Sequence, residues 1–208
     1  MNWAGKNREL VILGAGGHAK VVLATAMAAG WSCLSLYDDD ASKQGQEILG
    51  VTISGQLPSA DLFPDCWAVI AFGGNALRKQ VAHRYPTLRW ATVVHPSAVV
   101  HESVRLGFGT VVFAGCVIQP DTVIGSHCII NTSTSVDHDC QLGDFVHVAP
   151  GANLAGSVIL GSEVFLGIGV SVIPGVRIGE ATIVGAGACV VGNLASQITA
   201  IGVPARKI

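Results

Sequence analysis

An aliphatic residue stands at every sixth position through the second half of this chain. The seventeen members of the series are Val94, Val100, Leu106, Val112, Ile118, Ile124, Ile130, Val136, Leu142, Val148, Leu154, Leu160, Leu166, Val172, Ile178, Val184 and Val190. Hydrophobic residues make up 50% of the chain, so chance does not produce so long an unbroken run. A six-residue period is typical of a parallel β-solenoid, in which each hexad forms a short strand and a corner. Three hexads make one triangular coil, and we predict about five stacked coils.

Two other positions of the hexad support this interpretation. A small or β-branched residue follows most of the aliphatic residues four places later, where it can fill the space beside the inward side chain. Glycine often follows the aliphatic residue directly, as at Gly107, Gly125, Gly143, Gly161, Gly167, Gly179 and Gly185. We expect these glycines to relieve backbone strain at the corners. Cys116, Cys128 and Cys140 lie twelve residues apart, hence on different faces of a coil, and are expected to be packing residues rather than metal ligands.

The first ninety or so residues follow a different pattern, in which short apolar runs alternate with helical segments. We predict strands over 10–13, 33–37 and 68–72 and helices over 18–29 and 76–85, with 90–94 leading into the first coil. Alternating strands and helices form a small parallel sheet, here half of a Rossmann unit. The chain is therefore predicted to contain an α/β half-Rossmann domain over residues 1–92. An all-β parallel solenoid follows over residues 93–208 and ends in a short C-terminal tail.

A glycine-rich loop lies between the first predicted strand and the first predicted helix. It contains Gly14, Gly16 and Gly17 and fits the pattern G-x-G-x-x-A, and Asp38 and Asp39 follow about twenty positions later. Backbone N–H groups in such a turn, together with the helix N-terminus, favour an anion such as a phosphate. Half of a dinucleotide fold suits a mononucleotide or a nucleoside diphosphate linked to another group better than it suits NAD. A tight turn that binds no ligand is the alternative.

Composition narrows the classes of function. Only 12% of the residues are charged, the formal net charge is −2 and the mean hydropathy is +0.54. This charge balance gives no reason to expect a nucleic acid or an anionic membrane as partner, and no apolar run is long enough to cross a membrane. The segment from Met1 to Glu9 is charged and does not have the pattern of a signal peptide. We therefore expect a cytoplasmic protein with reduced cysteines, and the high hydropathy favours an oligomer.

The whole arrangement resembles a family, the bacterial sugar acetyltransferases of the PglD and NeuD type among the hexapeptide-repeat acyltransferases. The resemblance covers nearly the whole chain. It rests on the segments Gly14-Ala15-Gly16-Gly17-His18, Tyr37-Asp38-Asp39, Gly73-Gly74-Asn75-Ala76-Leu77-Arg78, Asn131-Thr132-Ser133-Thr134-Ser135-Val136-Asp137-His138-Asp139-Cys140, Gly143-Asp144-Phe145-Val146-His147-Val148 and Gly202-Val203-Pro204-Ala205-Arg206. The segment around His138 and the terminal Gly-Val-Pro-Ala-Arg are the most specific of these.

The resemblance implies a reaction and an assembly. Coils of this family are left-handed, the acetyl donor is acetyl-CoA, and the acceptor is the 4-amino group of a nucleotide-linked sugar, with UDP favoured as the nucleotide. No metal ion is expected. Homotrimers are the rule in the family, with active sites between adjacent subunits. The glycine loop, Asp38 and Asp39 would hold the nucleotide end of the acceptor, and the coils, paired with those of a neighbouring subunit, would hold CoA.

Acetyl transfer to an amine needs a base, because an ammonium group has no lone pair to attack the thioester. Histidine titrates near neutrality and suits this task. His138 matches the catalytic histidine of the family, and Asp139 beside it is expected to orient the ring and to stabilise the imidazolium. Some relatives carry glutamate at that place. Aspartate is one methylene shorter, so Asp137 is an alternative partner for the ring.

The 18-residue period places Gly156 one coil above His138 on the same face. Its backbone N–H is expected to stabilise the oxyanion formed at the thioester, and the missing side chain leaves room for the acetyl group. By the resemblance His147 lies near the thioester, and Ala186 and Arg206 are assigned to acetyl-CoA, with Arg206 near its phosphates. Further residues assigned to the sugar substrate are His18, Gly74, Asn75 and Asn131.

Three other functions compete with this one. A γ-type carbonic anhydrase has the same β-helix, but it needs two zinc-ligand histidines five residues apart, whereas His127, His138 and His147 are spaced by eleven and nine. A non-catalytic nucleotide-sugar-binding scaffold is disfavoured by the intact motif around His138. Sugar O-acetylation of the sialic acid type is the nearest alternative, since the same histidine can deprotonate an alcohol.

Overall fold

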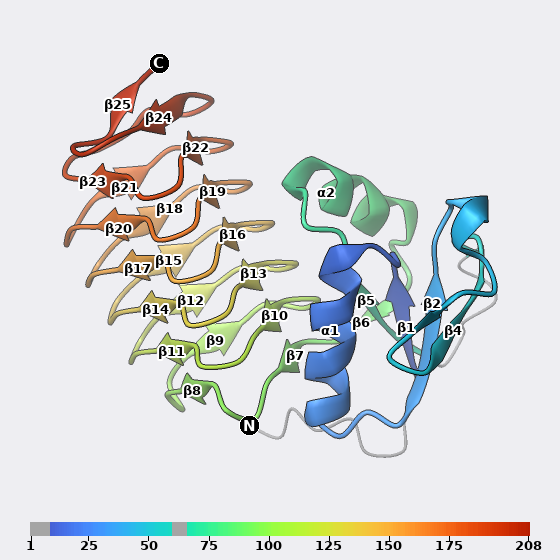
Figure 1. The fold of residues 1–208 in the computed structure, drawn as a ribbon. Helices are drawn as coiled ribbons and strands as arrows, with labels where there is room; N and C mark the ends of the chain where they lie inside the picture. The colour runs from blue at the N-terminus through green and yellow to red at the C-terminus, as the bar shows by residue number, and fades with distance from the viewer. Residues whose placement is uncertain (1–8, 60–65) are drawn as a thin grey trace.

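The computed structural model of the chain describes residues 9–59 and 66–208. These residues form an α/β domain and a tall stack of β coils that lie side by side, with the C-terminus at one end of the stack (Figure 1).

The α/β domain is built on a six-stranded sheet in the order β3-β4-β2-β1-β5-β6. Its strands are β1 (Glu9–Leu13), β2 (Cys33–Tyr37), β3 (Glu47–Ile48), β4 (Val51–Gly55), β5 (Trp67–Ile70) and β6 (Arg89–Trp90). Its helices are α1 (Gly17–Ala28), the 3-10 helix η1 (Ala41–Lys43) and α2 (Asn75–Arg84). Strand neighbours are parallel except β3 and β4. The predicted strands and helices of this half are present with shifts of one or two residues, whereas β3, β4, β6 and η1 were not predicted.

The central strand β1 is buried on both of its faces. Leu10 and Ile12 pack in one cluster with Val22 of α1, and Val11 and Leu13 pack in another cluster beneath α2. A parallel strand covered on both faces has a continuous apolar sequence instead of an alternating one. This burial explains why the short run of four aliphatic residues was enough to identify the strand.

The coils form a triangular prism with three sheets, here called faces 1, 2 and 3, in which all strand neighbours except the last pair of face 1 are parallel. Face 1 contains β7 (Val93–Val94), β10 (Val111–Val112), β13 (Ile129–Ile130), β16 (His147–Val148), β19 (Phe165–Leu166), β22 (Ile183–Val184), β24 (Thr199–Ile201) and β25 (Arg206–Lys207). Face 2 contains β8 (Val99–Val100), β11 (Val117–Ile118), β14 (Ser135–Val136), β17 (Asn153–Leu154), β20 (Ser171–Val172) and β23 (Cys189–Val190). Face 3 contains β9 (Arg105–Leu106), β12 (Val123–Ile124), β15 (Gln141–Leu142), β18 (Ile159–Leu160) and β21 (Arg177–Ile178).

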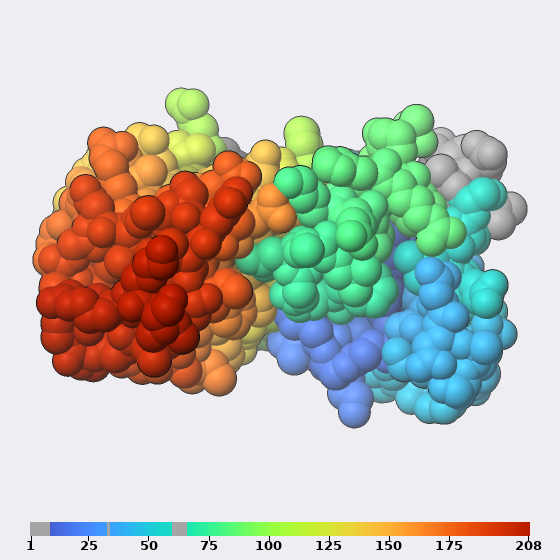
Figure 2. All heavy atoms as spheres, turned by 90° about the horizontal axis from the view of Figure 1, so that it is seen from above, coloured from blue at the N-terminus to red at the C-terminus, as the bar shows by residue number. Residues whose placement is uncertain are grey.

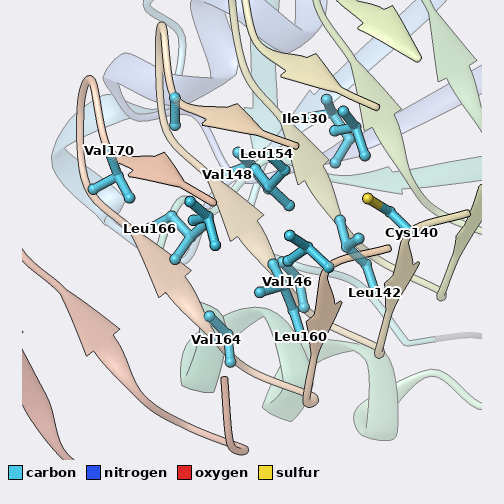
Figure 3. Close-up of a cluster of buried hydrophobic side chains, with 14 of the residues drawn as sticks. Ile130, Cys140, Leu142, Val146, Val148, Leu154, Leu160, Val164, Leu166 and Val170 are labelled. Carbon is cyan, nitrogen blue, oxygen red and sulfur yellow. The ribbon is translucent and has the colours of Figure 1, made fainter. Parts of the chain in front are cut away.

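The predicted aliphatic series fills the interior of the prism. Each strand pairs with the strand one coil later, as Val136 does with Leu154, and all members of the series from Val112 onward are buried. Figure 3 shows side chains from successive faces, including Val148, Leu154 and Leu160, converging on the axis of the coil. Five coils from β7 to β21 have a strand on every face, as predicted from the period.

The glycines that follow the aliphatic residues do not relieve backbone strain, so that prediction is wrong. None of the seven has a positive φ angle; left-handed backbone is found at other corner residues such as Asp139 and Glu163. The glycines are needed because the next coil lies against them. A Cβ atom added to Gly161 would lie 2.6 Å from the backbone nitrogen of Glu180, and one added to Gly143 would lie 2.6 Å from that of Ser162.

The β-helix also continues beyond Val190, where the six-residue series ends. Ile178 bridges to Leu194 and Val184 pairs with Ala200, in both cases sixteen residues later instead of eighteen. Because this last coil is two residues shorter, the period does not reveal it. Part of the predicted tail therefore belongs to face 1, as strands β24 and β25.

Face 1 carries the α/β domain. Val93, Val111 and Ile129, which point outward from this face, belong to the same buried cluster as Val22 of α1. Viewed along the prism, α2 and the rest of the α/β domain lie against one side of the coils (Figure 2). The corner between faces 2 and 3 is opposite face 1 in the triangle and lies on the side away from the α/β domain (Figure 1).

Candidate active site

His138 lies at the corner between faces 2 and 3, in the turn from β14 to β15. Its side chain is 57% exposed, and its Nδ1 lies 2.7 Å from Oδ2 of Asp139. The backbone N–H of His138 donates to Oδ1 of Asp137 at 2.8 Å. The two candidate partners therefore have different contacts in this structure, since Asp139 reaches the ring and Asp137 the main chain.

The hydrogen bond that Nδ1 of His138 donates to the carboxylate of Asp139 raises the pKa of His138 above its ordinary value, and the negative charges of Asp137 and Asp139 act in the same direction. With Nδ1 facing a carboxylate, Nε2 is the ring nitrogen that is left to accept a proton. An exposed imidazole oriented in this way is suited to accept a proton at Nε2 and to be stabilised as imidazolium by the aspartate.

Gly156 lies directly above the ring of His138, one coil later, as the 18-residue period predicted. The pairing of β14 with β17 sets this register, and the backbone N–H of Ser157 donates to the carbonyl of His138 at 2.8 Å. A Cβ atom at position 156 would lie 2.6 Å from both Cε1 and Nε2 of His138. Only a residue without a side chain leaves the imidazole its observed position.

A second cluster of predicted site residues lies in the seam between face 1 and the α/β domain. His147, on β16, is only 8% exposed, and its Nδ1 lies 3.1 Å from the carbonyl oxygen of Gly73. Its Nε2 lies 3.2 Å from Nδ2 of Asn131, and its ring meets Phe165 edge to face at 5.2 Å. Burial, with the positive charge of Arg78, lowers the pKa of His147 to about 4. His147 is therefore neutral at physiological pH.

His18 brings the glycine loop to the same seam. Its ring lies 5.4 Å from that of Phe113 and 6.1 Å from that of His147, measured between ring centres. Burial, followed by the charge of Arg78, lowers its pKa to about 4. Its Nε2 is buried and has no hydrogen-bond partner among the described residues.

The glycine loop combines a glycine of positive φ angle with the start of helix α1. Gly14 has a φ angle of +112°, and a Cβ atom there would lie 3.0 Å from the ring of Phe72. Gly16 is the N-cap of α1, which begins at Gly17 with neither a side-chain cap nor an acidic residue in its first turn. Uncapped N–H groups at the start of a helix favour a negatively charged group.

Asp38 and Asp39, at the end of β2, differ in their surroundings. Asp38 is 5% exposed; it accepts from the backbone N–H of Ala15 at 2.7 Å and pairs with Lys43 at 3.1 Å. Burial favours the neutral acid, but hydrogen bonds from the Asp40 and Ala15 backbone and from Lys43 outweigh it and lower the pKa of Asp38. Asp39 has a side chain that is 58% exposed and accepts from the backbone N–H of Leu57 at 2.9 Å. Asp38 thus holds the glycine loop through the backbone of Ala15, whereas the side chain of Asp39 is accessible to solvent.

The second glycine turn holds the two parts of the molecule together. Gly74 is the N-cap of α2. Asn75 donates from Nδ2 to the carbonyls of Glu163 at 2.8 Å and Val164 at 3.2 Å, both at the corner between faces 3 and 1. Its amide nitrogen is therefore engaged within the chain, and its assignment to the substrate stays a prediction.

Arg78, on α2, is a residue of this seam for which the sequence predicted no site role. It is 1% exposed, and its guanidinium donates to four carbonyls and one amide oxygen, those of His127, Phe72, Gly73, Phe145 and Asn75. Arginines are mostly exposed, so nothing in the sequence distinguishes this one except its place within the Gly73-to-Arg78 segment.

Ala186 and Arg206, the remaining predicted acetyl-CoA residues, are exposed near the C-terminal end of the prism. Ala186 lies at the corner between faces 1 and 2. Asn131 is at the same corner, three coils nearer the N-terminal end of the prism. Arg206, on β25, donates to the carbonyl of Ala205 at 3.0 Å.

The predicted residues thus form two groups that do not meet within one chain. The first group is at the corner between faces 2 and 3, here called the 2–3 corner, and contains His138, Asp139 and Gly156. The second group has Asn131 and Ala186 at the corner between faces 1 and 2, here called the 1–2 corner, and His147 with the glycine-loop residues in the seam on face 1. Face 2 separates the first group from the others.

The described residues hold no cluster of three or more His, Cys, Asp or Glu side chains that suits a metal ion. The three histidines compared with a zinc site lie apart. His127 is at the corner between faces 3 and 1, His138 is at the corner between faces 2 and 3, and His147 is on face 1. None of the helices in ranges 9–59 and 66–208 has the length and hydropathy that crossing a bilayer requires. Most of the N-terminal segment inspected for a signal peptide, residues 1–8, lies outside the described ranges.

Comparisons with known proteins agree with this architecture. Residues 9–85 match the family described as the PglD N-terminal domain. PerB from Caulobacter crescentus, solved in complex with CoA and GDP-perosamine, is 42% identical, with 97% of this chain and 98% of that chain covered and a TM-score of 0.91. The acetyltransferase domain of PglB from Neisseria gonorrhoeae, solved with acetyl coenzyme A, is 33% identical, with 97% and 100% covered and a TM-score of 0.90.

A curated relative, UDP-N-acetylbacillosamine N-acetyltransferase from Bacillus subtilis, is 40% identical over 105 residues. This match spans 48% of the present chain and 49% of the relative, so it covers about half the length of each.

A small parallel-sheet domain docked on one face of a left-handed hexapeptide β-helix defines a class, the hexapeptide-repeat acyltransferases with a Rossmann-like half domain. Within that class the chain belongs to the PglD-type family of sugar N-acetyltransferases. The predicted fold class and family are thereby confirmed.

Proposed function

We propose that this chain transfers the acetyl group of acetyl-CoA to the 4-amino group of a nucleotide-linked amino sugar. The observation that carries the proposal is the pair of His138 and Asp139 beneath Gly156, which is an oriented, accessible base in a chain of this family. The complexes of two relatives with CoA or acetyl coenzyme A support the donor, and the complex with GDP-perosamine supports the class of acceptor.

In the proposed reaction Nε2 of His138 accepts a proton from the sugar amine while the amine nitrogen attacks the thioester carbonyl carbon. A C–N bond forms, and the carbonyl oxygen takes the negative charge, which the backbone N–H of Gly156 would stabilise. The C–S bond then breaks, and the CoA thiolate leaves with the proton held by His138. Asp139 stabilises the imidazolium between these two steps.

The nucleotide end of the acceptor would bind at the glycine loop. The uncapped N-terminus of α1 would receive a diphosphate. Asp39, whose exposed side chain lies 3.4 Å from Arg84, would accept a hydrogen bond from a ribose or base. Asp38 would act indirectly, by holding the loop through Ala15. The resemblance favours UDP as the nucleotide. PerB, 98% of which is covered by the match, was solved with GDP-perosamine, so both nucleotides belong in the test.

A complete site would need a second subunit, because the base and the substrate-holding groups lie on opposite sides of face 2. If face 2 of three chains packed around a threefold axis, the 2–3 corner of one chain would meet the 1–2 corner of the next. His138 and Gly156 would then lie beside Asn131 and Ala186 of the neighbouring subunit. Face 2 presents small outward residues such as Ser135 and Ser171, which permit close approach. We propose the homotrimer on this ground.

The test is an assay of CoA release with acetyl-CoA and a panel of UDP-, GDP- and dTDP-linked sugars that carry a 4-amino group or hydroxyls only. Activity is expected on the amino sugars, and His138→Ala should reduce kcat about a thousandfold or more while leaving acceptor binding in place. His101→Ala is the matched control, since His101 is exposed at the same corner two coils away and should be dispensable. Unchanged turnover in His138→Ala would refute the assigned base.

Sugar O-acetylation is the second candidate, because an alcohol can lose its proton to the same histidine. Transfer to sugar hydroxyls with none to amines in this panel would establish it instead.

A further inference from the structure

The buried Arg78 belongs to a chain of hydrogen bonds that leads to a predicted substrate residue. Its five donors bind oxygen atoms from both parts of the molecule, and none of these oxygens belongs to a carboxylate. Burial accordingly lowers the pKa of Arg78 to about 10, which still leaves it charged at neutral pH. A buried cation without a directly bound carboxylate is costly, so a structural link alone is a poor explanation for it.

Arg78 and His147 share one acceptor, the carbonyl oxygen of Gly73. Nη1 of Arg78 donates to it at 3.1 Å, and Nδ1 of His147 lies 3.1 Å away. A carbonyl only accepts hydrogen bonds, so the proton of the imidazole must be on Nδ1. The groups that face His147 are His18 from α1, Arg78 from α2 and Phe165 from β19, and none of them supplies negative charge. The ring is thus the neutral Nδ1–H tautomer with a bare Nε2.

A bare Nε2 can only accept, so it determines the orientation of Asn131. Nδ2 of Asn131 lies 3.2 Å from Nε2 of His147, while Oδ1 accepts from the backbone N–H of Thr132 at 2.8 Å. Both ends of the amide are therefore assigned by their partners. The second hydrogen on Nδ2 has no partner among the described residues, and Asn131 is half-buried at the 1–2 corner.

We propose that Arg78 is a positioning residue: through Gly73 and His147 it sets the amide of Asn131 so that an N–H, and not an oxygen, is offered at the 1–2 corner. The group bound there is then a hydrogen-bond acceptor, namely an oxygen atom of the sugar or of the thioester, and not the amine. This inference rests on the proposed function for the identity of the ligand, but the tautomer and the amide orientation are properties of the free protein.

The first test is nitrogen NMR of the free protein with labelled histidine, with His147→Gln used to assign the resonance. The wild-type spectrum should show His147 as the neutral Nδ1–H tautomer from about pH 5.5 to 8, above its lowered pKa. In Arg78→Gln, which keeps donors but loses the charge, the proton affinity of His147 should rise about tenfold. Lys79→Gln is the matched control, because Lys79 pairs with Glu163 across the same seam without touching Gly73, and it should leave His147 unchanged.

If the wild-type spectrum shows His147 protonated on Nε2 or positively charged, the proposal is overturned without any variant. It is also overturned if Arg78→Gln folds and the proton affinity of His147 is the same as in the wild type. If Arg78→Gln does not fold, Arg78→Lys replaces it. Lys keeps the charge, so His147 should stay neutral, but with three donors it cannot hold all five oxygens. The Gly73 carbonyl should loosen, and kcat should fall with little change in KM for acetyl-CoA. A protonated His147 in Arg78→Lys, or wild-type kcat, would contradict the role.

The second test compares Asn131→Asp with Asn131→Ala in the acetyl-transfer assay. The carboxylate presents an oxygen where an N–H is required, so Asn131→Asp should lose about tenfold more kcat/KM than Asn131→Ala. A higher KM for the sugar would identify a sugar oxygen as the ligand, and a lower kcat the thioester oxygen. An aspartate variant as active as the wild type would overturn the donor role. Absence of activity in the wild type would refute the proposed function, whereas the NMR spectrum would still test the tautomer of His147 independently of it.

Discussion

His138 and Asp139 are neighbours in the sequence, yet their side chains meet at 2.7 Å. Successive side chains of an extended strand point to opposite faces, so neighbours of this kind normally do not touch. Asp139 has a left-handed φ angle of 59° at the corner of the coil, and this backbone conformation allows the contact. The same turn that closes the coil therefore orients the candidate base.

Replacing Asp139 by asparagine should change the pH dependence of turnover. The hydrogen bond from His138 to the carboxylate of Asp139 raises the pKa of His138, and a base must be neutral to accept a proton. Activity is therefore lost as the pH falls through the pKa of His138. Asp139→Asn lowers this pKa, so the acid limb of kcat/KM should move to lower pH, while the maximal rate falls because the imidazolium loses its carboxylate. Asp137→Asn, which removes only a more distant charge, should move the limb less; a larger shift would contradict the assignment.

Replacing Gly156 by alanine should displace the ring of His138. The new Cβ atom would lie 2.6 Å from Cε1 and Nε2, closer than any ordinary contact. Because His138 is exposed, the ring can rotate away with little loss of stability, so we expect a loss of kcat of about a hundredfold or more with nearly unchanged thermal unfolding. Steady-state kinetics and a melting curve test this. A fully active Gly156→Ala would show that the observed ring position is not the one used.

The single coil is the element that the six-residue period describes. Its inward aliphatic residue, small residue and corner could all be predicted, because each depends on neighbours within one or two coils. The reason for the corner glycines could not be predicted. Close approach of the next coil and a left-handed φ angle both favour glycine, so the sequence does not distinguish them. At Gly161 the structure shows close approach; at Gly109 it shows a φ angle of +71° together with the ring of His127.

The stability of a coil should therefore depend on the glycines that have no strained φ angle. In Gly161→Ala the new Cβ atom would lie 2.6 Å from the nitrogen and 2.8 Å from the Cα of Glu180, and the two coils must separate. We expect a loss of about 1–3 kcal/mol in the free energy of unfolding, measured with denaturant. Gly192→Ala is the control, because nothing lies within 4 Å of a Cβ atom there. Equal effects of the two changes would contradict this reason for the glycines.

At the scale of the whole molecule the two groups of candidate residues lie on opposite sides of face 2. A trimer should have a mass of about 64 kDa in solution, three times that of the 21.4 kDa chain, by light scattering. A monomer of full activity would contradict the shared site.

Mixing two variants that are impaired at different corners tests the shared site directly. Trimers assembled from His138→Ala and Asn131→Ala chains contain interfaces at which an intact 2–3 corner meets an intact 1–2 corner. Random assembly at equal amounts should restore roughly a quarter of wild-type activity. Mixing His138→Ala with Asp139→Asn, both changed at the 2–3 corner, is the control and should restore little. No recovery in the first mixture would place the site within one chain.

The sequence by itself determined the parts of this protein that depend on local or periodic patterns. The aliphatic series specified the β-helix, the buried run at Leu10–Leu13 specified the central strand, and the segment around His138 indicated the chemistry. The 18-residue period even placed Gly156 above His138, because parallel coils stack in register.

Only the tertiary structure decided how these parts meet. It docked the α/β domain on face 1, gave Asp38 and Asn75 internal partners and buried Arg78 against five oxygens. The last coil has sixteen residues instead of eighteen, so it does not continue the period, and only the strand pairing of the structure reveals it. These features arise from contacts between segments far apart in the chain. An exposed arginine and a buried one have the same letter in the sequence, and only the surrounding fold determines which side chains lose contact with water.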